Sequence, residues 1–231
     1  ECTACIAISD FIAGRLKSAL GIDAETIYNG VDLDVFRPAE APPSTPAVLM
    51  IGQLVPWKGQ RDFLQAASIV RKAFPSARFL LAGDDIFDDH PDYRAFLRAL
   101  AARLGIAEAV DFLGHRNDIP DLLRSASVLV LPSRNEPFGR SLIEAMASGL
   151  PTVAYAEGGP AEIVADGQTG LLVPPGDLEG LAAAIGRLLG DSGYARQLGR
   201  AGRARAEALF DARAAARKVM DVYARLLGGR Q

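Results

Sequence analysis

The chain has 231 residues, 49% of them hydrophobic, and a formal net charge of −3, which suits a globular core of one large domain or of one domain plus part of another. This balance, with a single basic run over residues 200–205, gives no electrostatic support for nucleic-acid binding. No apolar run reaches transmembrane length, and we expect no signal peptide, because the first residues lack a basic start and an apolar core.

The first forty residues predict a short strand–helix–strand unit followed by a linker. We expect a strand over 5–8, a helix over 10–20 with Ser9 as its N-cap, and a short strand over 26–28. Cys2 and Cys5 form a lone CxxC without further metal ligands nearby, so we predict reduced, buried core cysteines. The chain begins without Met and almost inside a strand, so we expect it to be a fragment of a longer protein.

The proline-rich stretch 38–46 is the clearest linker, and we place a domain boundary there. Beyond it, short apolar strands alternate with helices. The strands are predicted over 48–51, 79–82, 110–113, 128–131, 152–155 and 171–173, and the helices over 60–73, 91–104, 119–124, 160–164, 178–189, 194–209 and 212–227. This alternation predicts an α/β fold with a doubly wound parallel sheet, whose ligands bind at the carboxyl ends of the strands.

The stretch 132–151 organises the predicted site. It follows a buried strand and enters an amphipathic helix that Gly149 and Pro151 end. Glu136 is expected in the loop, and Glu144 about two turns into the helix. Residues 138–141 then lie where helix N–H groups attract an anion, and Gly139 lets a ligand approach the backbone. A carboxylate on each side of an anion site suits a nucleotide-sugar.

Each carboxylate also has a plainer interpretation. Ser141 and Glu144 fit a capping box, in which the Glu side chain bonds a backbone N–H at the start of the helix. Glu136 could be a solvated loop residue, and the two together could form the acid pair of a glycoside hydrolase. The surrounding anion-binding donors favour a phosphate ligand over that last alternative.

Other strand ends carry weaker signals. The loop 52–59 is neither GxGxxG nor a Walker loop, and its Lys58 is either solvated or able to reach an anion on the neighbouring helix. His115 and Arg116 could line a base pocket or form a surface turn. The acidic residues over 84–92 are better explained as a solvated loop and a polar helix start than as a phosphate-receiver pair or a metal site, so we predict no metal.

Several motifs together resemble one family. They are Asn29-Gly30-Val31-Asp32, the loop 52–59, Phe112-Leu113-Gly114, Glu136-Pro137-Phe138-Gly139 through Glu144, Ala145 through Pro151, and Gly170 through Val173. In this order they resemble the donor-binding half of a family 4 retaining glycosyltransferase (glycosyl transferase group 1) with the GT-B fold. The resemblance covers nearly the whole chain, and the Glu-x7-Glu element is its specific part.

The resemblance implies a two-domain enzyme with its active site in the cleft between the domains. Residues 41–231 would be the Rossmann-like nucleotide-sugar domain, and residues 1–40 a remnant of the N-terminal acceptor domain with the interdomain linker. The acceptor domain itself is then the missing partner. The family usually needs no metal or other cofactor, and the resemblance predicts a cytoplasmic enzyme whose membrane contact, if it makes any, is through the missing half.

The resemblance also implies roles for single residues. Glu144 would hold the ribose, Glu136 would face the transferred sugar, and Lys58 would neutralise the diphosphate. The remaining implied ligand contacts come from the backbone of Phe138, Gly139, Arg140, Ser141 and Leu142, from the loop at Gly52 and Gln53, and from His115 and Arg116 beside the base. The family often has an Arg that shares the diphosphate with the Lys, and this chain has the uncharged Gln53 at that position. We hypothesise that Arg140 partly compensates for the missing positive charge.

The predicted activity is transfer of a sugar from a nucleoside-diphosphate sugar to an acceptor with retention at the anomeric carbon. The fragment alone should bind donor but transfer poorly. Two alternatives stay open at this point. One is a sugar phosphorylase or nucleotide-sugar epimerase of the same fold, and the other is a non-catalytic nucleotide-sugar-binding module.

Overall fold

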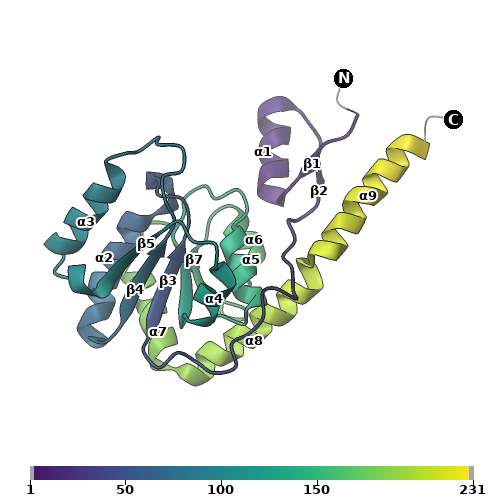
Figure 1. Cartoon of the computed structure of the whole chain (residues 1–231). Helices are drawn as coiled ribbons and strands as arrows, with labels where there is room; N and C mark the ends of the chain where they lie inside the picture. The colour runs from purple at the N-terminus through teal and green to yellow at the C-terminus, as the bar shows by residue number, and fades with distance from the viewer. Residues whose placement is uncertain (1–2, 229–231) are drawn as a thin grey trace.

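The computed structural model describes residues 3–228, and a six-stranded parallel sheet lies at its centre (Figure 1). The strand order is β5-β4-β3-β6-β7-β8, as in a Rossmann-like sheet. The strands are β3 (Ala47–Ile51), β4 (Arg78–Ala82), β5 (Val110–Gly114), β6 (Val128–Leu131), β7 (Thr152–Tyr155) and β8 (Leu171–Val173). The predicted α/β fold with a doubly wound parallel sheet is therefore confirmed.

Helices follow the strands in the predicted alternation. They are α2 (Gln60–Ala73), α3 (Tyr93–Arg103), α4 (Ile119–Arg124), α5 (Arg140–Ala147), α6 (Gly159–Ile163), α7 (Leu178–Gly190), α8 (Ser192–Leu209) and α9 (Ala212–Gly228), with 3₁₀ turns η1 (Pro56–Lys58) and η2 (Ala107–Ala109). None of the helices within residues 3–228 is both long enough and apolar enough to cross a membrane.

Two apolar clusters, one on each face, hold the sheet between its helices. Along β3, Val48 and Met50 belong to the cluster that includes Phe63 of α2 and Leu181 of α7, whereas Leu49 belongs to the cluster on the opposite face. Successive strand residues point to opposite faces, so a fully apolar strand has a buried partner on both sides. This is why the strands are continuous apolar runs rather than alternating ones.

Helix α8 passes from one face of the domain to the other, with Leu198 in the first cluster and Ala206 in the second. Two arginines of the basic run over residues 200–205, Arg203 and Arg205, bond to backbone carbonyls of the chain itself. Arg203 donates hydrogen bonds to the carbonyls of Phe36 and Ala147, and Arg205 donates to those of Glu162 and Ile163. Because carbonyls at helix ends lack intrahelical donors, these cations stabilise the ends of α5 and α6.

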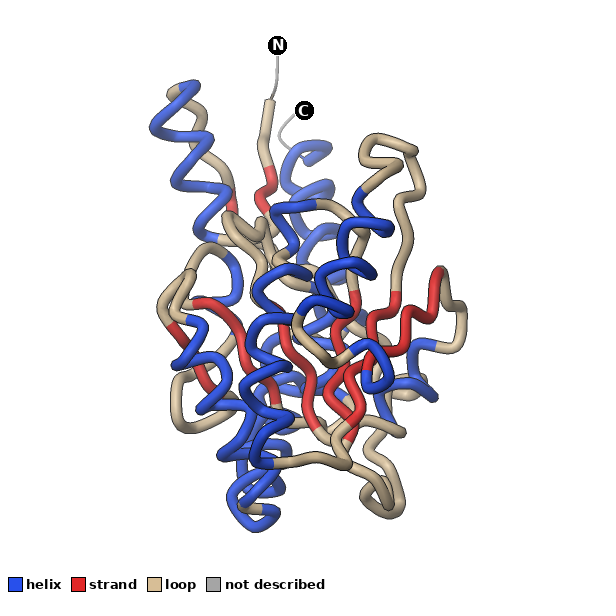
Figure 2. The backbone as a smooth tube through the Cα atoms, turned by 90° about the vertical axis from the view of Figure 1, so that its left-hand side faces the viewer, coloured by secondary structure: helices blue, strands red, loops and turns tan. Residues whose placement is uncertain are grey.

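The N-terminal segment forms a separate small unit. Strands β1 (Ile6–Ala7) and β2 (Glu25–Thr26) pair in parallel around α1 (Asp10–Leu20), which Ser9 caps as predicted. Figures 1 and 2 agree that this unit and the far end of α9 lie together at one end of the molecule, with both chain ends. Residues 38–46 then lead to β3 without helix or strand.

Two N-terminal predictions need correction. The second strand covers Glu25–Thr26 rather than 26–28. The amide of Ile27 makes the last hydrogen bond to β1, at 2.9 Å from the carbonyl of Ala7, and the ring of Tyr28 then packs against that of Phe138. Cys5 is a free thiol that is only half-buried, so its prediction as a core residue is wrong. Cys2 lies outside the described residues.

Candidate functional site

The candidate site lies where the winding of the sheet changes direction, between the neighbouring strands β3 and β6. The connection after β3 leads to one side of the sheet and the connection after β6 to the other, which opens a crevice at their carboxyl ends. An open pocket of about 480 Å³ occupies it. Its lining residues are Ile8, Asn29, Ile51, Gly52, Lys58, Glu136, Pro137, Phe138, Gly139, Arg140, Ser141 and Glu144.

The loops that follow β3 and β6 touch backbone to backbone. Gly59, with φ of +83°, approaches so closely that a Cβ on it would lie 2.0 Å from the carbonyl oxygen of Pro132. The amide of Arg134 donates to the carbonyl of Trp57 over 2.8 Å. The glycine that ends the loop 52–59 is therefore required by the packing, and this contact fixes Lys58 relative to Glu136.

Lys58 and Glu136 meet in an ion pair of 2.7 Å between Nζ and Oε2. Their side chains are 17% and 7% exposed, so the pair is largely shielded from water. The Lys58 ammonium also lies 4.3 Å from the centroid of the Trp57 ring, a cation–π distance. Two residues predicted at the site from different loops are thus brought into direct contact.

The N-terminus of α5 faces the same pocket. Gly139, with φ of +104°, is its N-cap and makes no side-chain cap, and Arg140 and Ser141 form the first turn. The first N–H groups of a helix have no acceptor within the helix, and together with the helix dipole they favour an anion. The backbone geometry therefore agrees with the predicted anion site.

Glu144 lines the same pocket and follows this turn in the chain, whereas Glu136 precedes it. It is the fifth residue of α5, so it sits about one turn into the helix and not two, because α5 begins only at Arg140. The capping box is also wrong: Ser141 is inside the helix, and the Glu144 carboxylate lies 3.4 Å from Nη2 of Arg140 instead. The Glu144 side chain is 13% exposed, whereas Arg140 is 73% exposed.

Burial favours the protonated form of the Glu144 carboxyl. Loss of hydration raises the pKa of its carboxyl above the usual value, and the nearby Arg140 guanidinium offsets only part of that rise. A shielded carboxylate with one loosely held cation retains acceptor capacity, which ligand hydroxyls could use.

Two predicted site residues have side chains buried away from the pocket, and of these two only Phe138 lines it. Leu142 is fully buried in the apolar cluster beneath α5. Phe138 is 2% exposed, and its ring lies 6.0 Å from that of Tyr28 and 6.1 Å from that of Phe210. Their side chains hold the turn in place. The amide of Leu142 donates to the carbonyl of Gly139 at 2.9 Å, so it already has an acceptor within the chain. The contacts of these backbone N–H groups with a ligand stay predictions.

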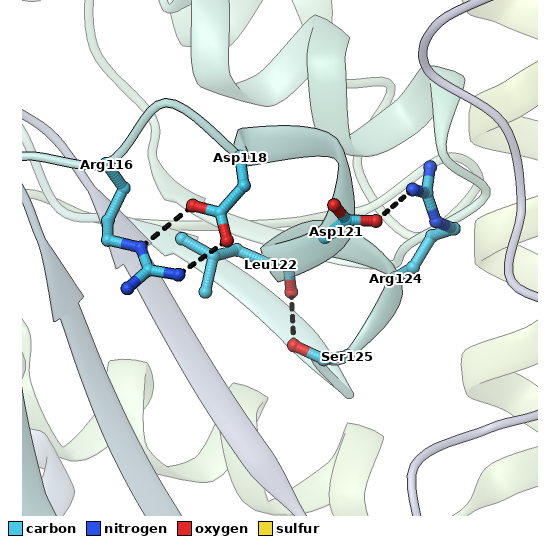
Figure 3. A network of polar contacts seen from close by, with 6 residues as sticks. All are labelled: Arg116, Asp118, Asp121, Leu122, Arg124 and Ser125. Atoms are coloured by element: carbon cyan, nitrogen blue, oxygen red, sulfur yellow. Dashed lines mark hydrogen bonds and ion pairs between the residues drawn. The ribbon is translucent and has the colours of Figure 1, made fainter.

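Besides Leu142, three predicted residues do not line the pocket. Gln53 uses its carbonyl to accept the side-chain amide of the buried Gln60 at 2.7 Å. His115 and Arg116 are exposed at the end of β5, and Figure 3 shows the Arg116 guanidinium facing the Asp118 carboxylate at the start of α4. Their contacts with a ligand stay predictions.

The sequence did not predict four lining residues, namely Ile8, Asn29, Ile51 and Pro137. Ile8 and Asn29 come from the N-terminal unit. Ile8 directly follows β1, which belongs to a separate two-stranded sheet, so the rule that parallel strands end at one edge does not bring it to the pocket. Asn29 belongs to the motif Asn29-Gly30-Val31-Asp32, one of those on which the family resemblance is based.

The acidic loop before α3 is occupied by internal contacts. The Asp85 carboxylate accepts the amides of Asp89 and His90, and Asp84 pairs with Arg94, which lowers the pKa of Asp84. Among residues 3–228, no three His, Cys, Asp or Glu side chains gather closely enough to hold a metal ion.

Comparison with known proteins identifies relatives of this fold and site. The family model "Glycosyl transferases group 1" matches residues 34–205. A glycogen synthase of Mycobacterium tuberculosis is 36% identical over 201 residues, which is 85% of this chain and 47% of that protein. The chain therefore spans about half the length of the curated relatives it matches.

Two solved structures show the same fold. Anabaena Alr3699/HepE, in complex with UDP and glucose, superposes with a TM-score of 0.90 at 29% identity, over 96% of this chain and 63% of that one. The C-terminal domain of the group 1 glycosyl transferase LpcC from Francisella tularensis superposes with a TM-score of 0.70 at 26% identity, over 79% of this chain and 99% of that one. The sheet domain thus matches a C-terminal domain of this class.

Proposed function

The chain belongs to the glycosyl transferases of group 1, and on that premise we propose that it is the donor-binding half of a retaining glycosyltransferase. In this proposal it binds a nucleoside-diphosphate sugar, whose sugar is transferred to an acceptor held partly by a domain outside this chain. Residues 41–231 form the donor domain, and residues 1–40 belong to the acceptor half and the linker. The enzyme works in the cytoplasm, and membrane contact, if it makes any, is through the absent half.

One observation carries the proposal: the N-terminus of α5 is bracketed by Glu136 and Glu144 in the same pocket, with Lys58 brought in from the loop after β3. A diphosphate fits against the helix terminus, since that terminus offers N–H donors and positive potential. Glu144 then accepts ribose hydroxyls, and Glu136 faces the sugar.

The proposed chemistry depends on charge that develops on the leaving diphosphate. The N–H groups at the α5 terminus are in place before the reaction, so they can stabilise that charge with little reorganisation. Lys58 adds its charge by turning from Glu136 toward the phosphate, which frees the Glu136 carboxylate for the sugar. Arg140 is exposed at the rim and supplies a second cation, a role that Gln53 cannot take.

A UDP-sugar is the favoured donor. The support is that Anabaena Alr3699/HepE, at 29% identity, is solved with UDP and with UDP-glucose. We propose contacts to the base from the loop at His115 and Arg116, which lies at the carboxyl end of β5.

Isothermal titration of this chain with UDP, GDP and ADP tests the proposal. We expect UDP to bind most tightly and Glu144→Gln to weaken it about tenfold, since hydrogen bonds to a charged group contribute roughly 1.5–3 kcal/mol. The exposed Glu179 in α7 provides the charge-matched control, and Glu179→Gln should leave the affinity unchanged. A wild-type chain that binds none of the three nucleotides would overturn the proposal.

A further inference from the structure

Two carbonyls of the turn between β6 and α5 are held from outside that turn. The carbonyl of Glu136 accepts the amide of Gly159 at 2.9 Å, and the carbonyl of Pro137 accepts the hydroxyl of Ser9 at 2.6 Å. A carbonyl and the following N–H belong to one planar peptide unit. The carbonyl of Pro137 shares its plane with the N–H of Phe138, so the Ser9 hydroxyl fixes that N–H. The carbonyl of Glu136 shares its plane with the nitrogen of Pro137, which carries no hydrogen, so the Gly159 amide fixes the entry into the turn.

Ser9 belongs to the N-terminal unit and uses its hydroxyl twice. It is fully buried, donates to Pro137, and accepts the amide of Ile12 at 3.1 Å as the N-cap of α1. A hydroxyl has one proton to donate and lone pairs to accept with, so both bonds form at once. The start of α1 is in this way fastened directly to the turn.

Glu162 of α6 holds the same end of α1 from the other side. Its Oε2 accepts the amide of Asp10 at 2.8 Å, and its Oε1 accepts the amide of Phe11 at 2.6 Å. A carboxylate at a helix N-terminus satisfies N–H groups that lack partners and interacts favourably with the dipole. Helix α6 begins at Gly159, the residue that holds the carbonyl of Glu136.

These contacts close a ring that runs from the turn through Ser9, α1, Glu162 and α6 and back to the turn. The backbone of α6 packs closely against the turn. A Cβ on Gly158 would lie 2.4 Å from the carbonyl oxygen of Glu136, and one on Gly159 would lie 2.4 Å from Cα of Phe138. A displacement of α1 or α6 must therefore be transmitted to the turn.

We propose that Ser9 and Glu162 are positioning residues for the nucleotide site. Neither is required to touch the ligand; together they hold the Glu136–Gly139 turn in the orientation that presents its N–H groups to an anion. The identity of the ligand rests on the proposed function, but the positioning itself does not. Preorganised donors bind more tightly because binding costs less ordering.

The first test measures two properties of Ser9→Ala in the whole chain: amide hydrogen exchange over residues 136–142, and UDP affinity by titration. Ser9→Ala removes both hydroxyl bonds, and we expect faster exchange in that segment and about fivefold weaker binding, the scale of the single bond that reaches the turn. Ser9→Thr keeps the hydroxyl and should restore both. Asp177→Ala removes a comparable N-cap, on α7, and should leave both properties as in wild type.

The second test is a double-mutant cycle with Glu162→Gln, which keeps one acceptor oxygen. We expect it to weaken UDP binding about twofold. Ser9→Ala combined with Glu162→Gln should cost less than the product of the single effects, because both act through α1. Multiplicative effects would contradict the ring.

Exchange in the turn that is unchanged in Ser9→Ala would overturn the positioning role, whatever nucleotide binds. If the wild type binds no nucleotide, the proposed function fails while the exchange measurement still decides whether Ser9 positions the turn. An equal loss of affinity in Asp177→Ala would show a general effect of stability and would also overturn the proposal.

Discussion

Lys58 and Glu136 depend on each other for stability as well as for the proposed chemistry. We predict that Lys58→Met lowers the free energy of unfolding by about 3 kcal/mol, since it leaves the Glu136 side chain, which is 7% exposed, without its cation. Urea denaturation, followed by circular dichroism, measures this change.

The double variant Lys58→Met/Glu136→Gln is the control for that result. It removes both charges, so we expect it to recover more than half of the lost stability. If the double variant were less stable than Lys58→Met alone, the carboxylate would be stabilised by something other than Lys58.

Glu144 should give the chain a pH dependence of defined sign. Burial raises its pKa above the usual 4.5, so the folded chain keeps a proton that the unfolded chain has already lost. Stability contributed by Glu144 is therefore present below about pH 4.5 and falls as the pH rises through the raised pKa. We predict that Glu144→Gln gains stability relative to wild type over the interval in which the pH rises from about 4.5 through the raised pKa, in urea titrations at each pH. A relative loss over that interval would contradict the raised pKa.

The residues that the sequence identified best are those whose position follows from an apolar strand. Lys58 and Glu136 could be placed because each follows a buried strand, and parallel strands end at one edge. Glu144 was placed a turn too deep, because the sequence does not reveal that Gly139 adopts φ of +104° and delays the helix to Arg140. Ile8 was missed because its approach to the pocket depends on tertiary docking of the N-terminal unit.

At the scale of elements, close approach between loops decides which glycines matter. We predict that Gly59→Ala destabilises the chain by more than about 3 kcal/mol, because the left-handed backbone costs roughly 1–2 kcal/mol and the new Cβ also collides with Pro132. The measurement is the urea midpoint at an unchanged slope.

Gly105 is the matched control, because it has φ of +69° but nothing within 4 Å of a Cβ. Gly105→Ala should cost about 1 kcal/mol, the conformational part alone. Equal losses in the two variants would mean that contact between the loops after β3 and β6 contributes nothing.

Helices and strands with a regular spacing of apolar residues could be predicted from the sequence. Elements whose bounds depend on packing against the rest of the chain could not. The helix over 60–73 and the strand over 128–131 match their predicted bounds, since apolar spacing and burial agree there. The second strand was placed too late because Tyr28 is apolar for packing against the core, where its ring lies 5.5 Å from that of Phe210, while Ile27 is buried and makes the last hydrogen bond to β1. A single sequence does not separate these two reasons for an apolar pair.

At the scale of the whole molecule, three aromatic rings join parts that are distant in sequence. The ring of Phe210, between α8 and α9, lies 5.5 Å from that of Tyr28 in the N-terminal unit and 6.1 Å from that of Phe138 in the turn between β6 and α5. Its carbonyl also accepts the amide of Val31 at 2.7 Å. The C-terminal helices, the N-terminal unit and the site thus share one apolar cluster.

This arrangement predicts that a cavity at Phe210 weakens nucleotide binding at the site. Phe210→Leu should lower the free energy of unfolding by about 1 kcal/mol and weaken UDP binding about threefold, since Phe138 loses the ring that fixes it. Phe79→Leu is the control: it opens a similar cavity in the opposite cluster, beside Phe63, and should cost the same stability without changing affinity. Urea denaturation and UDP titration of both variants measure the two quantities. Equal affinities in the two variants would show that the C-terminal helices support the fold without reaching the site.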